Sequence, residues 1–171
     1  MSKVIMRNVI EHGGQIVGAI DRNPDVVGKD IAEIMEIEGR TGVTISDDAD
    51  KVLSETEADL VILTTMSYVK EVYPSIIKCV ENGMNVLTLA DEAIYPWNTS
   101  TIETAHLDRL AKKHNVTVTG TGMQDIFWIN MPALALAGMN KVERVEGTIS
   151  YNVEDYGVDG IDFSASDLSF I

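Results

Sequence analysis

Side chains that could bind a ligand or move a proton stand at the ends of short aliphatic runs. The runs that read as buried strands lie at 16–20, 59–65, 85–90 and 116–122, with a weaker candidate at 43–45. The residues at or just past their ends are Asp21, Arg22, Thr64, Thr65, Met66, Ala90, Asp91, Glu92 and Thr121. Ligands of a parallel sheet bind beyond the carboxyl ends of its strands, so this distribution predicts a site along one sheet edge.

The first of these positions has two interpretations. Asp21 could accept hydrogen bonds from the hydroxyls of an adenosine ribose, with Arg22 beside it for a 2′-phosphate. Alternatively, Asp21 begins a turn, because Asn23 and Pro24 follow it and both residue types favour turns. The spacing alone leaves both interpretations open.

The segment LADEAIYPW holds the pair with the most distinctive chemistry. Asp91 and Glu92 leave a buried strand, and apolar and aromatic residues follow them at once. A partly desolvated carboxylate has a raised pKa and can bind an amine or exchange a proton. The alternative is a pair of solvated loop acids in a chain that has 27 acidic residues.

Two further groups could line the same site. The hydroxyls of Thr64 and Thr65 could form a polar shelf beside a dinucleotide, whereas Ser67 reads as the cap of the next helix. A helix that starts near Gln124 would present polar and aromatic side chains to a ligand, or it is a helix start with aromatic core residues. These side chains are those of Gln124, Asp125, Trp128 and Asn130.

Helices alternate with the strands along the chain. Apolar residues repeat with helical spacing over 68–82, and Gly83 follows as a stop signal. A second helix is predicted over 98–115, a short capped helix over 46–55, and another strand over 142–153. This alternation with short connections predicts an α/β fold, a Rossmann-like parallel sheet with helices on both faces.

Composition restricts the class of partner. The formal net charge is −14, so the phosphates of nucleic acid or of an anionic membrane would be repelled. The single cysteine, Cys79, lies in a helical pattern and is predicted to be buried, and no histidine pair has metal-ligand spacing with a third ligand. No run approaches the ~20 apolar residues of a membrane span, and the N-terminus does not read as a secretory signal. We therefore expect a cytoplasmic protein with a small-molecule ligand, without a metal, a nucleic acid or a membrane partner.

Five segments of the sequence carry a resemblance to one family. They are QIVGAIDRNPDVVGKDI, ADLVILTT, GMNVLTLADEAIYPW, GTGMQDIFWINMPALALAG and VERVEGTISYNVEDYG. Together they resemble the 2,4-diaminopentanoate dehydrogenases and native amine dehydrogenases, whose N-terminal domain is similar to that of dihydrodipicolinate reductase. The segments DEAIYPW and GTGMQDIFWINMP are the most specific parts of this likeness.

The resemblance implies oxidative deamination of a small amine or diamino acid with NAD or NADP, reversible as reductive amination. It implies that Glu92, with Asp91 beside it, supplies the catalytic carboxylate near the reacting amine. It implies a substrate and nicotinamide pocket lined by Gln124, Asp125, Trp128 and Asn130. It implies cofactor contacts from Asp21, Arg22, Thr64, Thr65, Met66, Ala90 and Thr121.

The sequence departs from this family at both ends. The family begins with a strand and a glycine-rich loop, whereas residues 1–14 match its first helix. The inward-facing residues of that helix would be Met1, Val4, Ile5, Asn8 and Val9. We therefore expect an incomplete NAD(P)-binding Rossmann domain over 1–122 that lacks the first strand and the loop. Residues 123–171 would form a connecting helix and the beginning of a substrate and oligomerisation domain.

The absent strand would lie at the centre of the family's sheet, between the strands that end at Asp21 and Thr64. The glycine-rich loop that follows this strand supplies the backbone donors that bind the phosphates. Because these donors would be absent too, we expect the chain to bind NAD(P)H weakly or not at all and to be inactive alone. A homo-oligomer is expected for the full-length form. Two alternatives stay open, an imine reductase of the dihydrodipicolinate reductase type and a non-catalytic truncated remnant.

Overall fold

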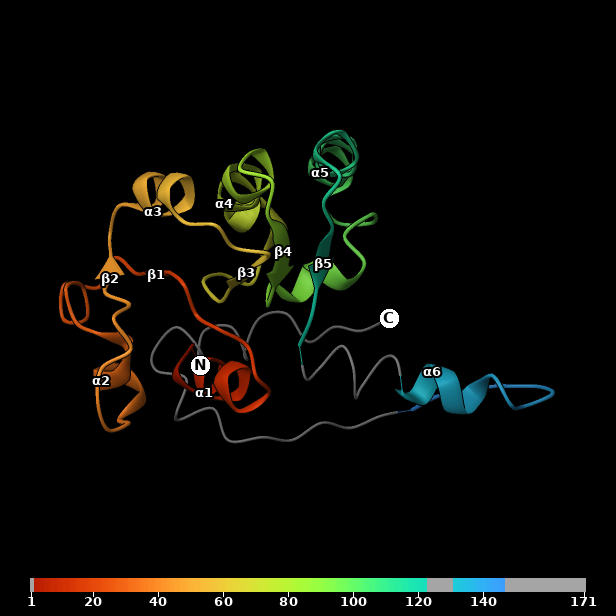
Figure 1. Cartoon of the computed structure of the whole chain (residues 1–171). Helices are drawn as coiled ribbons and strands as arrows, with labels where there is room; N and C mark the ends of the chain where they lie inside the picture. The colour runs from red at the N-terminus through yellow and green to blue at the C-terminus, as the bar shows by residue number, and fades with distance from the viewer. Residues whose placement is uncertain (1, 123–130, 147–171) are drawn as a thin grey trace. The chain divides into compact units, whose positions relative to one another are not determined.

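The computed structural model describes residues 2–122 and 131–146, which fall into two compact units, Met1–Leu134 and Ala135–Ile171. The first unit alternates short strands and helices (Figure 1). The second unit is described over 135–146, where only the end of helix α6 (Met131–Leu136) is regular. Within these described ranges, no helix has the length and apolar character needed to cross a membrane.

The strands of the first unit pair in parallel and form two separate sheets. Strand β1 (Ala19–Ile20) pairs with β2 (Ile45–Ser46). Strand β4 (Asn85–Thr88) lies between β3 (Leu60–Leu63) and β5 (Val118–Gly120) in the second sheet. The predicted α/β class with a parallel sheet is therefore confirmed.

Helices cover both faces of these strands. Three of them, α3 (Ala49–Glu55), α4 (Val69–Glu81) and α5 (Thr101–His114), line up along one face. Helix α1 (Ser2–Glu11) lies on the other face (Figure 1), and α2 (Ile31–Met35) packs against α1. The helices predicted over 68–82, 98–115 and 46–55 are thus confirmed, with ends shifted by a few residues.

The main core forms where the apolar stripe of α4 meets the second sheet. Val72, Ile76 and Val80 of α4 pack with Val86 of β4, and each is at most 1% exposed. Cys79 belongs to this core, and burial raises the pKa of its thiol to about 11. A thiol held in its neutral form is a poor nucleophile, so the prediction of a structural cysteine is confirmed.

A smaller core lies under the first sheet and is separate from the main core. Ile31 and Met35 of α2 pack with Ile45 of β2, and Met6 of α1 contacts this group. The side chain of Arg7 donates from Nε to the carbonyl oxygen of Met35 at 2.9 Å, which fastens α1 to the end of α2. Each sheet therefore has its own apolar support.

The two described sheets have four outer strand edges, and two of them belong to β1 and β3. In the part of the chain that the structure describes, β1 bonds only to β2 and β3 bonds only to β4. Ile20 at the end of β1 is 41% exposed and Leu60 at the start of β3 is 46% exposed, so both edges carry accessible aliphatic surface. No described strand lies between them.

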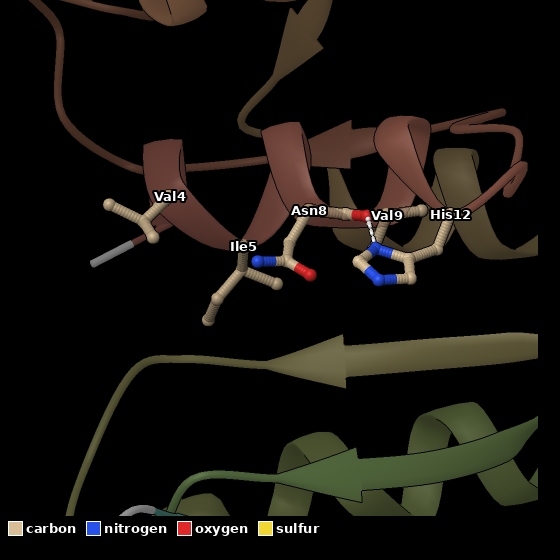
Figure 2. A pocket seen from close by; sticks show the side chains of 5 residues that line it. All are labelled: Val4, Ile5, Asn8, Val9 and His12. Carbon is tan, nitrogen blue, oxygen red and sulfur yellow. Dashed lines mark hydrogen bonds between the residues drawn. The ribbon is translucent and has the colours of Figure 1, made fainter.

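The described side chains of helix α1 that were predicted to face inward are partly buried or exposed. The predicted stripe of Val4, Ile5, Asn8 and Val9, with His12, lines a cavity of about 380 Å³ instead of a packed core (Figure 2). Val4 is 64% exposed, and none of the described residues of α1 is buried. Met1 lies outside the described residues.

Two predicted strands differ from the structure. The run 16–20 forms only the two paired residues of β1, because pairing with β2 begins at Ala19. Residues 142–146 of the strand predicted over 142–153 have no regular structure, and the rest of that run lies outside the described residues. A strand needs a hydrogen-bonding neighbour, and none of the described segments pairs with 142–146.

The carboxylate of Asp30 holds the connection between α2 and β2. It accepts hydrogen bonds from the Ala32 N–H at 2.9 Å, from the Gly42 N–H at 2.9 Å and from the Thr41 hydroxyl at 2.7 Å. These donors, with the Thr41 hydroxyl foremost, hold the pKa of Asp30 well below its ordinary value of 3.8. The carboxylate therefore caps α2 and fixes the loop that leads into β2.

We predict that Asp30→Asn lowers the thermal midpoint of unfolding at about pH 7, because an amide replaces one of the two acceptor oxygens. In the native chain the folded-state pKa of Asp30 is depressed, so its stabilisation is present above pH 3.8 and is lost as the pH falls through the folded pKa. The difference between the two proteins should therefore shrink in acid. Thermal unfolding followed by circular dichroism checks this, with the exposed Asp25→Asn as control. Equal midpoints for Asp30→Asn and the native chain at neutral pH would contradict it.

Candidate functional site

The predicted site residues that the structure describes stand at the carboxyl ends of four strands. Asp21 follows β1, Thr64 follows β3, Ala90 follows β4 and Thr121 follows β5. Because β1 belongs to one sheet and β3, β4 and β5 to the other, these residues form separate local clusters. The predicted residues Gln124, Asp125, Trp128 and Asn130 lie outside the described residues.

Asp21 is exposed and takes part in a turn. Its backbone N–H donates to the Ser46 carbonyl at 3.0 Å, and its Oδ1 accepts from the Asn23 N–H at 2.8 Å. The turn predicted at Asp21 is therefore present. It uses one carboxylate oxygen, Oδ1, and Oδ2 takes no part in that hydrogen bond. Since the second oxygen is accessible at the end of β1, the geometry also permits a bond to a ribose hydroxyl.

Arg22 lines a polar cavity of about 330 Å³ at the start of α3. The lining includes three aspartates and one lysine besides Arg22, and Lys78 of α4 forms an ion pair with Asp50 at 2.6 Å. The aspartates are Asp47, Asp48 and Asp50. Asp48 caps α3 by accepting from the Lys51 N–H at 3.0 Å, so part of this acidic cluster serves the helix.

Thr64 lies beside the beginning of α1. Its hydroxyl forms a hydrogen bond with the hydroxyl of Ser2 at 2.9 Å. The first turn of α1 has backbone N–H groups without helical acceptors, so two hydroxyls and a helix N-terminus meet here. Thr65 and Met66 follow Thr64 on the surface, and Met66 is 53% exposed.

The acid pair lies on a short 3₁₀-helix, η1 (Asp91–Ile94), directly after β4. The backbone of η1 packs on Gly120 at the end of β5. A Cβ at position 120 would stand 2.6 Å from Ile94 N and 2.7 Å from the Ala93 carbonyl oxygen, closer than any real side chain permits. Only a glycine at position 120 therefore allows the backbone of η1 to lie this close to β5.

Asp91 is half-buried and hydrogen-bonded to the hydroxyl of Ser67. Burial raises the pKa of Asp91, and the bond from Ser67 opposes this rise in part. The prediction of a partly desolvated carboxylate in the DEAIYPW segment is thus met by Asp91. The alternative of two freely solvated loop acids does not fit, because both side chains of the pair are partly buried and have partners.

Glu92 connects η1 to two neighbouring helices. Its Oε2 accepts from the backbone N–H of Val69, the first residue of α4, at 2.9 Å. The same oxygen lies 3.4 Å from the hydroxyl of Ser100, the buried residue that precedes α5. Within the part of the chain that the structure describes, neither Asp91 nor Glu92 forms an ion pair, so their charges are not compensated locally.

Three contributors to this cluster were missed by sequence reasoning. Ser67 was read as a helix cap, but its hydroxyl bonds to Asp91. Ser100 and the Val69 N–H gave no signal, since their bonds to Glu92 link residues 8 and 23 positions apart. Gly120 at the end of β5 could be read from the sequence. Its contact with η1 could not, because that contact depends on the register of β5 with β4.

This arrangement could bind a cation and receive its proton. Two carboxylates without a basic partner attract a positive group, and a half-buried acid with a raised pKa exchanges protons more readily near neutral pH. Among the described residues, no three histidine, cysteine or acidic side chains gather as metal ligands do.

Comparison with known proteins gives three matches. A family model described as dihydrodipicolinate reductase, N-terminus, matches residues 1–88. The 2,4-diaminopentanoate dehydrogenase of Acetoanaerobium sticklandii is 28% identical over 143 residues, which make up 84% of this chain and 40% of that protein. The structure of an amine dehydrogenase from Mycobacterium smegmatis superposes with a TM-score of 0.81 and 39% identity, over 84% of this chain and 42% of the other. The chain thus spans less than half the length of these two relatives.

We predict that Gly120→Ala destabilises the fold by roughly 1–3 kcal/mol, the range for overpacking in a well-packed region. The added Cβ must push η1 away from β5, so the bond from the Val69 N–H to Glu92 should lengthen as well. Denaturant unfolding measures the first effect, and amide hydrogen exchange at Val69 measures the second. Gly138→Ala is the matched control, because a Cβ there meets nothing closer than 3.8 Å. Native-like stability of Gly120→Ala would show that η1 does not rest on β5.

Proposed function

The chain belongs to the family of dihydrodipicolinate reductase N-terminal domains. We propose that it carries residues that bind the dinucleotide cofactor, and the acid pair Asp91–Glu92, of an NAD(P)-dependent amine dehydrogenase. The observation that supports this most directly is the pair Asp91–Glu92 at the carboxyl end of β4, which forms no ion pair with any residue that the structure describes. The similarity to a 2,4-diaminopentanoate dehydrogenase and to an amine dehydrogenase suggests a small amine or diamino acid as substrate.

The proposed reaction needs a group that removes a proton from the substrate. An alkyl ammonium has a pKa near that of lysine, about 10.4, and therefore arrives protonated. A nicotinamide cofactor, when bound, accepts the hydrogen of the amine-bearing carbon together with the two electrons of that C–H bond. The nitrogen lone pair must be free for this, so the ammonium first gives a proton to a carboxylate of the acid pair. The resulting iminium then takes up water and releases ammonia, which leaves a carbonyl group.

The donor chemistry at the other strand ends fits a dinucleotide. Oδ2 of Asp21 can accept from a ribose hydroxyl, and Arg22 beside it can accompany a 2′-phosphate. The hydroxyls of Ser2 and Thr64, with the first turn of α1, offer donors to phosphate oxygens. Thr65, Met66, Ala90 and Thr121 stand along the same carboxyl edge and are proposed to complete the cofactor contacts.

An imine reductase that acts on dihydrodipicolinate is the second candidate, favoured by the family model. That substrate carries two carboxylates and would meet the negative charges of Asp91 and Glu92. Like charges at short distance cost free energy, whereas an ammonium gains it. The charge of the site therefore favours a cationic amine over the dicarboxylate.

We predict that 2,4-diaminopentanoate shifts the backbone amide signals of residues 90–94 in an NMR titration and that pyridine-2,6-dicarboxylate does not. The double variant Asp91→Asn/Glu92→Gln should weaken amine binding at least about fivefold, as expected from the loss of roughly 1 kcal/mol of charge attraction. Glu57→Gln/Asp59→Asn removes the same charge at the opposite end of β3 and serves as control. Binding of the dicarboxylate at residues 90–94 would instead support the reductase.

We also predict weak but detectable binding of NADH or NADPH in saturation-transfer NMR, with a Kd on the order of millimolar. Saturation should reach the adenosine ribose protons and should be lost in Asp21→Ala, since the variant has no carboxylate at the end of β1. Asp59→Asn, which changes an exposed acid just before β3 in the other sheet, should keep it. Saturation that is absent for both cofactors, or unchanged in Asp21→Ala, would contradict the proposed cofactor site.

A further inference from the structure

The ends of β1 and β2 lie side by side and bring the charged residues that follow both strands together. The N–H of Asp21 donates to the carbonyl oxygen of Ser46, the last residue of β2, at 3.0 Å. Asp47 and Asp48 come directly after Ser46 and lead into α3 (Figure 1). These two acids therefore stand next to the end of β1, where the adenosine ribose of a dinucleotide is proposed to bind.

The polar cavity of about 330 Å³ at this point has an excess of negative charge. Arg22 lines it together with Asp47, Asp48, Asp50 and Lys78. Lys78 and Asp50 neutralise one another in an ion pair at 2.6 Å. Among the other charged groups of the lining, one guanidinium stands against two carboxylates.

The carboxylates of Asp47 and Asp48 have no cation bound to them. Both side chains are exposed, and neither forms an ion pair with a residue that the structure describes. Oδ1 of Asp48 accepts from the N–H of Lys51 at 3.0 Å, which holds this carboxylate at the beginning of α3. The cavity therefore keeps two fixed negative groups beside Arg22.

The two nicotinamide dinucleotides differ at one position of the adenosine ribose, where NAD has a 2′-hydroxyl and NADP a 2′-phosphate. A hydroxyl can donate to the carboxylate of Asp21. A phosphate monoester carries a charge of about −1.5 to −2 near pH 7 and offers that carboxylate no such donor. Attraction to Arg22 would then be opposed by repulsion from Asp21, Asp47 and Asp48. The balance of charges favours the hydroxyl.

We propose, on the basis of the proposed cofactor site, that this chain selects NAD over NADP and that Asp47 and Asp48 are specificity-determining residues. Arg22 alone would favour a 2′-phosphate. The two carboxylates in the same cavity compete for its guanidinium and repel the phosphate. The preference therefore depends on the residues that follow β2 as well as on Asp21 at the end of β1.

The test uses the adenosine ends of the two cofactors as probes, 5′-AMP and adenosine 2′,5′-bisphosphate. Neither probe has a nicotinamide or an amine, so their binding does not involve the acid pair. The Kd of each is measured on the full chain by titration in saturation-transfer NMR. The variant Asp47→Asn/Asp48→Asn removes both charges, and asparagine keeps an acceptor oxygen that can cap α3. The matched control is Glu57→Gln/Asp59→Asn, which removes two charges just before β3.

We expect the native chain to bind 5′-AMP at least about threefold more tightly than the bisphosphate in low salt, as exposed charges imply. The ratio should fall to about one or below in Asp47→Asn/Asp48→Asn, because Arg22 is then free for the phosphate. Adding Arg22→Gln to this variant should weaken the bisphosphate again and change 5′-AMP little. The control Glu57→Gln/Asp59→Asn should keep the native ratio.

Ionic strength gives a second readout of the same charges. The Debye length falls from about 30 Å at 0.01 M salt to about 8 Å at 0.15 M. The preference of the native chain for 5′-AMP should therefore shrink over this range, as it would not if the bisphosphate were excluded by its size.

Three results would contradict the proposal. A native chain that binds the bisphosphate as tightly as 5′-AMP, or more tightly, would refute the preference while the cofactor site itself stands. An unchanged ratio in Asp47→Asn/Asp48→Asn would refute the assignment to these two aspartates. If neither nucleotide receives saturation at its ribose protons, the proposed cofactor site fails together with this inference. The amine titration at residues 90–94 tests the acid pair separately.

Discussion

The close packing of η1 on Gly120 is the contact on which the acid pair depends. Strand β5 ends under the backbone of Ala93 and Ile94, and no larger residue fits between them. Once η1 lies at this height, Asp91 reaches Ser67 and Glu92 reaches the start of α4. The site is thus built from the ends of two paired strands and the beginnings of two helices. Its geometry follows from the register of β4 with β5, in which Thr88 pairs with Gly120.

The regular elements of the second sheet could be predicted because their patterns are local. The apolar stripe of α4 repeats with helical spacing, Gly83 adopts the left-handed conformation that ends the helix (φ 76°), and β4 reads as a buried aliphatic run. The first sheet was harder to predict, since β1 and β2 are two residues each and depend on pairing with one another. The exposure of α1 could not be read from its stripe, because burial depends on which neighbours are present.

The strand ends were found from the sequence, but the bonds that give them chemistry were not. Asp91 and Glu92 stood out because they leave a predicted buried strand and apolar and aromatic residues follow them at once. Their partners Ser67, Val69 and Ser100 come from other elements, and a single sequence gives no information about such contacts.

The acid pair is the proposed binding place of a cationic amine. A second acidic cluster, Asp47, Asp48 and Asp50 beside Arg22, offers a competing location in a chain with a net charge of −14. The most direct test is a map of intermolecular nuclear Overhauser effects from the methine protons of bound 2,4-diaminopentanoate. If the amine binds at the acid pair, these protons should show contacts with the amides of Ala90 and Asp91 and with the side chain of Ser67. Contacts confined to the cluster at Asp47–Asp50, or spread evenly over the acidic surface, would contradict it.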